Sequence, residues 1–318
     1  MKWTAIHGLN LMAPKRSSFS FMNPGKYNFT SLLFYVSILI LLFSCQKQKK
    51  TYYESIALND IKLSSSPKPG SWRYNHEEHF QTFADFQKLK KIKPVPGKGT
   101  IYLQPIGQFD KLQKKEIVLI QHYLKTYFQL ETKVLPVLSN TIFPEKVKRI
   151  SKEGQEQVLA GYVLDSILIK RKPKDAIVLM GITEKDLFPL PEWNYAFGLA
   201  SYKDGVGVTS IYRFADGQLT DSNFNKSLLR LIKISSHEIG HMFGISHCLN
   251  ANCVMNGTNS LSETDYHLAR ACSLCQRKLN SSIHYDNKKR LHELKDFFEE
   301  QHLNTEFSLA QQDLNLLQ

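Results

Sequence analysis

The stretch HEIGHMFGISHCLNANC, residues 237–253, places three histidines and two cysteines close together. His237 and His241 are four residues apart, so on a helix both imidazoles project from one face and can bind the same metal ion. Gly244 can end that helix in a left-handed conformation, which lets the chain turn so that His247 reaches the same ion. Three ligands leave a fourth coordination position open for water, as in catalytic zinc sites.

Glu238 follows the first histidine of this motif. In the pattern H-E-x-x-H, that carboxylate lies near the open position without binding the ion and can take a proton from zinc-activated water. Composition alone would give H-E-x-x-H-x-x-G-x-x-H at an expected count of roughly 3 × 10⁻⁵ in this chain. We therefore expect peptide-bond hydrolysis with Glu238 as general base and then general acid. The alternative is a non-catalytic zinc-binding lipoprotein that acts as a binding module, although a structural site would not need Glu238.

Four more metal-binding side chains follow the histidines: Cys248, Cys253, Cys272 and Cys275. Two pairs of thiolates, one of them a C-x-x-C, suit a closed tetrahedral zinc site. Disulfides are the alternative because export of the chain is also predicted, as described below, but a C-x-x-C bridge would close a short, strained ring. We expect two zinc ions per chain, one catalytic and one structural.

The motif continues into Cys248, Cys253 and Met255, with a C-x-x-C pair near Arg270, and this arrangement resembles the archaemetzincin family. That family belongs to the metzincin clan of zinc peptidases and has a second, four-cysteine zinc. The resemblance covers most of residues 100–279. It implies that Met255 packs in a Met-turn beneath the catalytic zinc and that a strand near 195–202 forms the upper edge of the cleft. A tyrosine that some metzincins place two residues after the methionine is replaced by Gly257.

Hydrophobic periodicity predicts an α/β fold with a mixed twisted sheet, an antiparallel edge strand, an active-site helix carrying H-E-x-x-H and a small zinc-stapled C-terminal part. A hairpin is predicted around Asp204 and Gly205. The expected strands cover 100–107, 131–138 and 176–183, and the expected helices cover 114–128, 156–169, 226–243 and 287–302.

Residues 29–44 carry no charge and follow Lys26, as expected for the apolar core of an export signal. The sequence LLFSC, residues 41–45, resembles the lipobox of bacterial lipoproteins, which would make Cys45 a lipidated N-terminus. The alternative is an uncleaved N-terminal anchor. Both interpretations predict a protein of the bacterial cell envelope that faces outside the cytoplasm.

These patterns divide the chain into a signal segment (1–44), a tether and N-terminal segment (45–98), a peptidase domain (99–280) and a helical tail (281–318). Within the second part, HEEHFQTFADFQKL predicts a short amphipathic surface helix whose His76 and His79 are not metal ligands. The net charge is +12, but its lysines are scattered, so no nucleic-acid partner is expected. The expected partners are a peptide or protein substrate and a membrane, and no oligomeric state is predicted.

Overall fold

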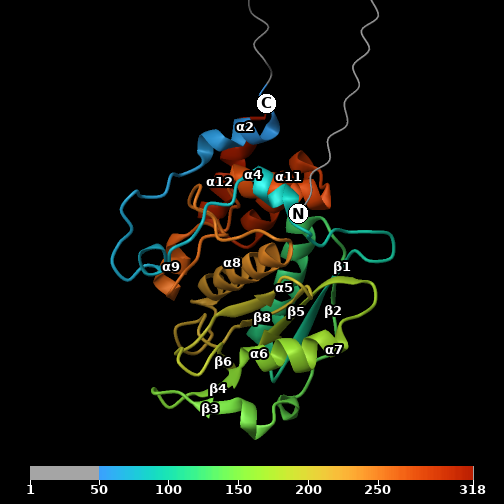
Figure 1. The fold of residues 1–318 in the computed structure, drawn as a ribbon, viewed down its shortest axis with the longest axis vertical. Coiled ribbons are helices and arrows are strands. Elements are labelled where there is room, and N and C mark those ends of the chain that lie inside the picture. The colour runs from blue at the N-terminus through green and yellow to red at the C-terminus, as the bar shows by residue number, and fades with distance from the viewer. Residues whose placement is uncertain (1–49, 318) are drawn as a thin grey trace, which may run out of the picture. The chain divides into compact units, whose positions relative to one another are not determined.

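A five-stranded mixed sheet lies at the centre of residues 50–317, the part of the chain that the computed structural model describes (Figure 1). The strand order is β2-β1-β5-β8-β7, with β7 antiparallel to β8 and the other neighbours parallel. The predicted mixed sheet with an antiparallel edge strand is thus confirmed. The strands are β1 (Thr100–Ile106), β2 (Thr132–Val134), β5 (Ala176–Thr183), β7 (Gly198–Ser201) and β8 (Val206–Ser210).

Helices cover both faces of this sheet and bury its central strand, β5. Every residue of β5 is buried, as expected for a parallel strand between two layers. Helices α5 (Lys111–Phe128) and α8 (Phe224–Met242) contribute to the hydrophobic core on one face. The other face is covered by 160–171, which consists of α6 (Ala160–Tyr162), a π-helical segment (Val163–Leu168) and α7 (Ile169–Arg171).

The predicted helix over 156–169 is wrong in its first turn, where the chain forms a strand. Strand β4 (Glu156–Leu159) lies between β3 (Lys148–Ile150) and β6 (Asp186–Phe188) in a second, three-stranded sheet. Its buried Gln157 donates hydrogen bonds to Asp186 Oδ2 and to the Asn194 carbonyl, both at 2.8 Å. These partners are distant in sequence, so local periodicity could not reveal the strand.

Four helices follow the histidine motif: α9 (Leu261–Tyr266), α10 (Ser273–Ile283), α11 (Asn287–Glu300) and α12 (Asn304–Asn315). The helix predicted over 287–302 corresponds to α11, which packs against α5 and α12. The predicted histidine-bearing helix corresponds to α8, with ends that differ by one or two residues from the expected 226–243.

The N-terminal segment packs along the domain from residue 50 onward and is not a free tether there. It contains α2 (Tyr52–Ile56), α3 (Trp72–Asn75) and α4 (Phe83–Lys88), and the Ile56 and Phe86 side chains are fully buried. The amphipathic helix predicted from residue 76 onward is shorter in the structure. It corresponds to α4 and begins at Phe83, because Thr82 and Asp85 form a capping box that fixes its start.

The predicted export segment and Cys45 lie outside the described residues. Within 50–317, no helix is both long and apolar enough to cross a membrane.

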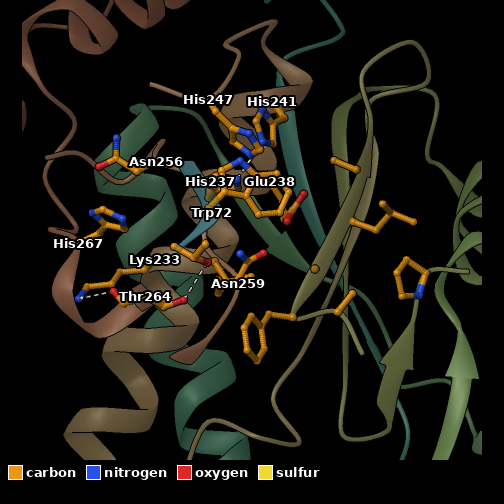
Figure 2. A pocket seen from close by; sticks show the side chains of 18 of the residues that line it. Trp72, Lys233, His237, Glu238, His241, His247, Asn256, Asn259, Thr264 and His267 are labelled. Carbon is orange, nitrogen blue, oxygen red and sulfur yellow. Dashed lines mark hydrogen bonds between the residues drawn. The ribbon is translucent and has the colours of Figure 1, made fainter. Parts of the chain in front are cut away.

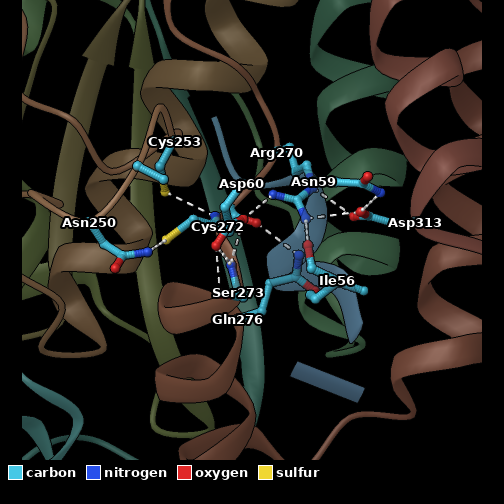
Figure 3. A network of polar contacts seen from close by, with 12 residues as sticks. Ile56, Asn59, Asp60, Asn250, Cys253, Arg270, Cys272, Ser273, Gln276 and Asp313 are labelled. Carbon is cyan, nitrogen blue, oxygen red and sulfur yellow. Dashed lines mark hydrogen bonds and ion pairs between the residues drawn. The ribbon is translucent and has the colours of Figure 1, made fainter. Parts of the chain in front are cut away.

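Arg270 joins this N-terminal segment to the C-terminal helices (Figure 3). Its guanidinium donates to Asp60 at 2.6 Å, to the Ile56 carbonyl at 2.9 Å and to both carboxylate oxygens of Asp313 at 2.6 and 2.9 Å. The Arg270 and Asp313 side chains are almost fully buried. Because the charges are shielded from water and well paired, they fix three chain segments relative to one another.

We predict that Arg270→Met lowers the free energy of unfolding by about 3–5 kcal/mol, because it leaves Asp60 and Asp313 buried without their cation. Urea denaturation measures the change. Lys289→Ala, which breaks an exposed pair with Glu293, is the control and should change it by less than about 1 kcal/mol. Equal effects of the two variants would show that the buried ion pairs of Arg270 stabilise the fold no more than an exposed pair does.

Candidate metal centre

Helix α8 presents the first two histidines of the motif on its cleft-facing side. The His237 and His241 ring centroids are 4.4 Å apart, as expected for residues one turn apart. The helix ends at Met242, and Gly244 has a φ of +89°, which favours glycine. The resulting turn carries the chain back, so that the His247 ring lies 5.2 Å from His237 and 4.9 Å from His241 (Figure 2).

The Nδ1 atoms of all three histidines are held by oxygen atoms. His237 Nδ1 lies 2.9 Å from the Val254 carbonyl, and His241 Nδ1 lies 2.6 Å from the Ile245 carbonyl. His247 Nδ1 contacts the Glu78 carboxylate. A carbonyl oxygen can only accept, so Nδ1 carries the proton in His237 and His241, and the Nε2 atom is left with a lone pair.

The lone pairs of the three histidines point toward one another, as the ligands of a single metal ion must. The ligand atoms of the three histidines lie within 4.8 Å of one another, and the Nε2 atoms of His237 and His241 are 2.9 Å apart. Burial and the His241 imidazole lower the pKa of His237 well below its usual value. Burial and the His247 imidazole lower the pKa of His241 to about 3. Neutral rings with facing lone pairs repel one another, and a bound cation relieves that repulsion, so the residues fit zinc.

Glu238 lies beside the triad and points into the same cleft. Its side chain is almost fully buried, and burial raises its pKa to about 8. The carboxylate lies against strand β7, where a Cβ on Gly198 would be only 2.6 Å from Glu238 Oε1. Glycine at this position therefore gives Glu238 the space to lie between the helix and the edge of the sheet.

The cleft in front of the triad has a volume of about 720 Å³. One wall is the free edge of β7, and the loop after Val254 forms another part of the lining. The strand predicted near 195–202 is therefore at the sheet edge, as expected. Trp72 and Trp193 also line the cleft, and the His76 and Trp193 ring centroids approach to 6.5 Å.

The four cysteines form a second cluster in the described chain. Their sulfur atoms lie within 4.8 Å of one another, all four are buried, and none is in a disulfide. Backbone N–H groups point at the sulfurs, from Cys272 to Cys253 at 3.2 Å and from Asn250 to Cys248 at 3.4 Å. Hydrogen bonds from the neighbouring thiols lower the pKa of Cys248 well below its usual value. This arrangement suits a closed four-thiolate zinc site and disfavours the disulfide alternative.

Met255 lies between the two clusters. It is buried beneath α8, where a Cβ on Gly240 would come within 2.4 Å of the Met255 sulfur. Its carbonyl accepts from the Cys248 backbone N–H at 2.7 Å. The Met255 side chain thus packs against α8 at Gly240, and its place in a Met-turn stays a prediction.

The contribution of residues 50–98 to this centre was not predicted from the sequence. Glu78 contacts His247, and Trp72 lies edge-on to the same ring with centroids 5.0 Å apart. Glu78 belongs to the HEEH stretch, for which the sequence predicts only a surface helix. His79 itself is exposed.

Comparison with known proteins identifies the family. The model of Peptidase family M54 matches residues 150–281. Archaemetzincin-2 of Homo sapiens is 33% identical over 258 residues, which is 70% of each chain. Archaemetzincin of Pyrococcus furiosus is 36% identical over 132 residues, or 41% of this chain and 67% of that one. A crystal structure of archaemetzincin from Methanopyrus kandleri is 26% identical, with a TM-score of 0.49 over 60% of this chain and 99% of that chain. This chain belongs to the archaemetzincin family of zinc metallopeptidases.

Proposed function

We propose that the chain hydrolyses peptide bonds at the three-histidine centre, with His237, His241 and His247 as zinc ligands and Glu238 as the proton-transfer group. The observation that supports this most directly is the convergence of three imidazoles next to a buried carboxylate in an open cleft. A structural zinc site would need neither the cleft nor the carboxylate.

Zinc, when bound there, supplies Lewis-acid chemistry that polarises a peptide carbonyl and acidifies water. Glu238 then has two tasks, to accept a proton from the attacking water and to deliver it to the departing amine. Burial raises the pKa of Glu238 to about 8, which suits the second task, because a carboxyl group with this proton affinity can hold a proton until it donates it to the amine.

The edge strand suits a substrate in extended conformation. Strand β7 has a neighbour on one side only, so its other edge can form backbone hydrogen bonds with a peptide that adds as a further strand. Such a peptide would pass directly in front of Glu238 and the triad, since Gly198 of β7 lies against the Glu238 carboxylate.

The second zinc would be held by Cys248, Cys253, Cys272 and Cys275. A closed site of four thiolates has no position for substrate, so its contribution is to stability. It would join the loop after His247 to the start of α10, and thereby restrain the loop that carries Met255.

We predict that Glu238→Gln lowers kcat by about 10²–10⁴-fold while zinc remains bound, because the amide keeps the shape of the side chain but cannot accept the proton. Turnover on a peptide library, zinc content and melting temperature are measured together. Glu116→Gln is the matched control, since Glu116 is also a buried carboxylate with a raised pKa, but it does not line the cleft. A zinc-loaded wild type without turnover on a broad library would favour the binding-module alternative.

Elemental analysis should find two zinc ions per chain, and Cys253→Ser and His237→Ala should each remove a different one. Cys253→Ser should also lower the melting temperature strongly, since a structural zinc contributes directly to folding. After denaturation with a chelator, the four cysteines of the cluster should react with a thiol reagent without prior reduction. Cysteines that react only after reduction would establish disulfides.

We also infer that Cys45 carries a lipid that anchors the protein in the bacterial cell envelope, facing outside the cytoplasm. The support is the uncharged stretch 29–44 and the sequence LLFSC. Cys45→Ala should therefore move the protein from the membrane fraction to the soluble fraction after cell lysis and centrifugation. A variant that stays in the membrane with its signal uncleaved would favour the simple anchor.

A further inference from the structure

His247 differs from the other two histidines of the triad in how it is supported. His237 and His241 are on α8, and their Nδ1 atoms are held by main-chain carbonyls within the motif region. His247 follows the turn at Gly244 and is on irregular chain, with 21% of its side chain exposed. A ligand on a loop needs contacts from elsewhere to hold its ring in place.

Those contacts come from residues 72–81 of the N-terminal segment. The Glu78 carboxylate contacts His247 Nδ1, across 169 positions of sequence. The carboxylate is only 18% exposed, and its second oxygen is buried without a hydrogen-bond partner. The Glu78 carboxylate therefore interacts with the His247 imidazole and not with water.

Gln81, three residues further on, fixes the turn that leads to His247. Its amide nitrogen donates to the Gly244 carbonyl at 3.0 Å, and its amide oxygen accepts from the Ser246 backbone N–H at 3.2 Å. The ammonium group of Lys278, on α10, donates to the Gln81 main-chain and side-chain oxygens at 2.6 and 3.0 Å. The segment is thereby anchored to the helix that follows the cysteine cluster.

Trp72 secures the other end of this segment. Its backbone N–H donates to Glu263 at 2.9 Å, and its indole lies against Gly257, where a Cβ would be 2.3 Å from the indole nitrogen. The indole also stacks on His76 at 3.8 Å between ring centroids. Glycine at position 257 therefore gives the tryptophan the space to reach the edge of the His247 ring.

We propose that Glu78 is a positioning residue of the catalytic centre: it orients His247 and strengthens zinc binding through that ring. A carboxylate on the distal nitrogen fixes the tautomer that leaves Nε2 free for the ion and makes the imidazole a stronger ligand. Residues 72–81 lie outside the segment that matches the peptidase family model, so the metal site includes contacts from a part of the chain beyond that segment. The inference rests on the assignment of His247 as a zinc ligand under the proposed function.

The test compares Glu78→Ala and Glu78→Gln in the full chain, with the neighbouring exposed Glu77→Ala as the matched control. Zinc affinity is measured by competition with a chromophoric chelator, and the four-thiolate site of the same molecule is the internal reference. We expect Glu78→Ala to weaken one zinc of the two by about 10- to 100-fold and to leave the other unchanged. Glu78→Gln should have a smaller effect, because its amide oxygen can still accept from Nδ1 but carries no charge.

If the wild type cleaves peptides, the turnover of both Glu78 variants should recover in excess zinc. Turnover lost through a folding defect would not recover. The isosteric Glu78→Gln keeps the proposal testable if Glu78→Ala does not fold. A zinc dissociation constant within about twofold of wild type and of Glu77→Ala for both Glu78 variants would overturn it. Because zinc affinity is measured without substrate, this result is independent of whether the chain cleaves peptides.

Discussion

The convergence of three imidazole lone pairs is the constraint on which the rest of the centre depends. The Nε2 atoms of His237 and His241 face each other at 2.9 Å, which is unfavourable without a cation between the rings. The fold brings them together because oxygen acceptors fix each Nδ1 and because α8 is anchored in the core. Part of the folding free energy therefore maintains an arrangement that only metal binding relieves, so the stability of this region and its zinc affinity are coupled.

Three chain segments provide that rigidity, and one of them is distant in sequence. The turn at Gly244, the loop around Met255 and the N-terminal segment all contact the histidines or the residues next to them. Asp60 extends this support to the cysteine cluster, because it accepts from the Ser273 backbone N–H at 3.2 Å beside Cys272 and also binds Arg270 (Figure 3). The N-terminal segment thus contacts residues at or next to both candidate zinc sites.

Local patterns in the sequence predicted the elements whose determinants are local. The spacing from His237 to His247 specifies the helix and turn that bring the three rings together, and the unbroken apolar run of β5 indicates a buried strand. Strand β4 was mistaken for helix because Gln157 is satisfied by Asp186 and Asn194, far along the chain. The roles of Asp60, Trp72 and Glu78 were likewise not predicted. Asp60 and Trp72 flank the Ser- and Pro-rich stretch 62–71, which is typical of a solvated spacer, and Glu78 lies in a predicted surface helix, while their partners are distant in sequence.

The burial of Glu238 links this support to the proposed catalysis. A carboxylate in water has a pKa near 4.5 and gives up its proton too readily to act as an acid at neutral pH, whereas burial raises that of Glu238 to about 8. Strand β7 contributes to this burial, because it approaches the carboxylate closely at position 198, which has no side chain. The same strand offers its free edge to an extended peptide. Strand β7, which would align the substrate, thus also helps to raise the pKa of Glu238, which would transfer the proton. A change in the path of β7 would therefore alter substrate alignment and proton transfer together.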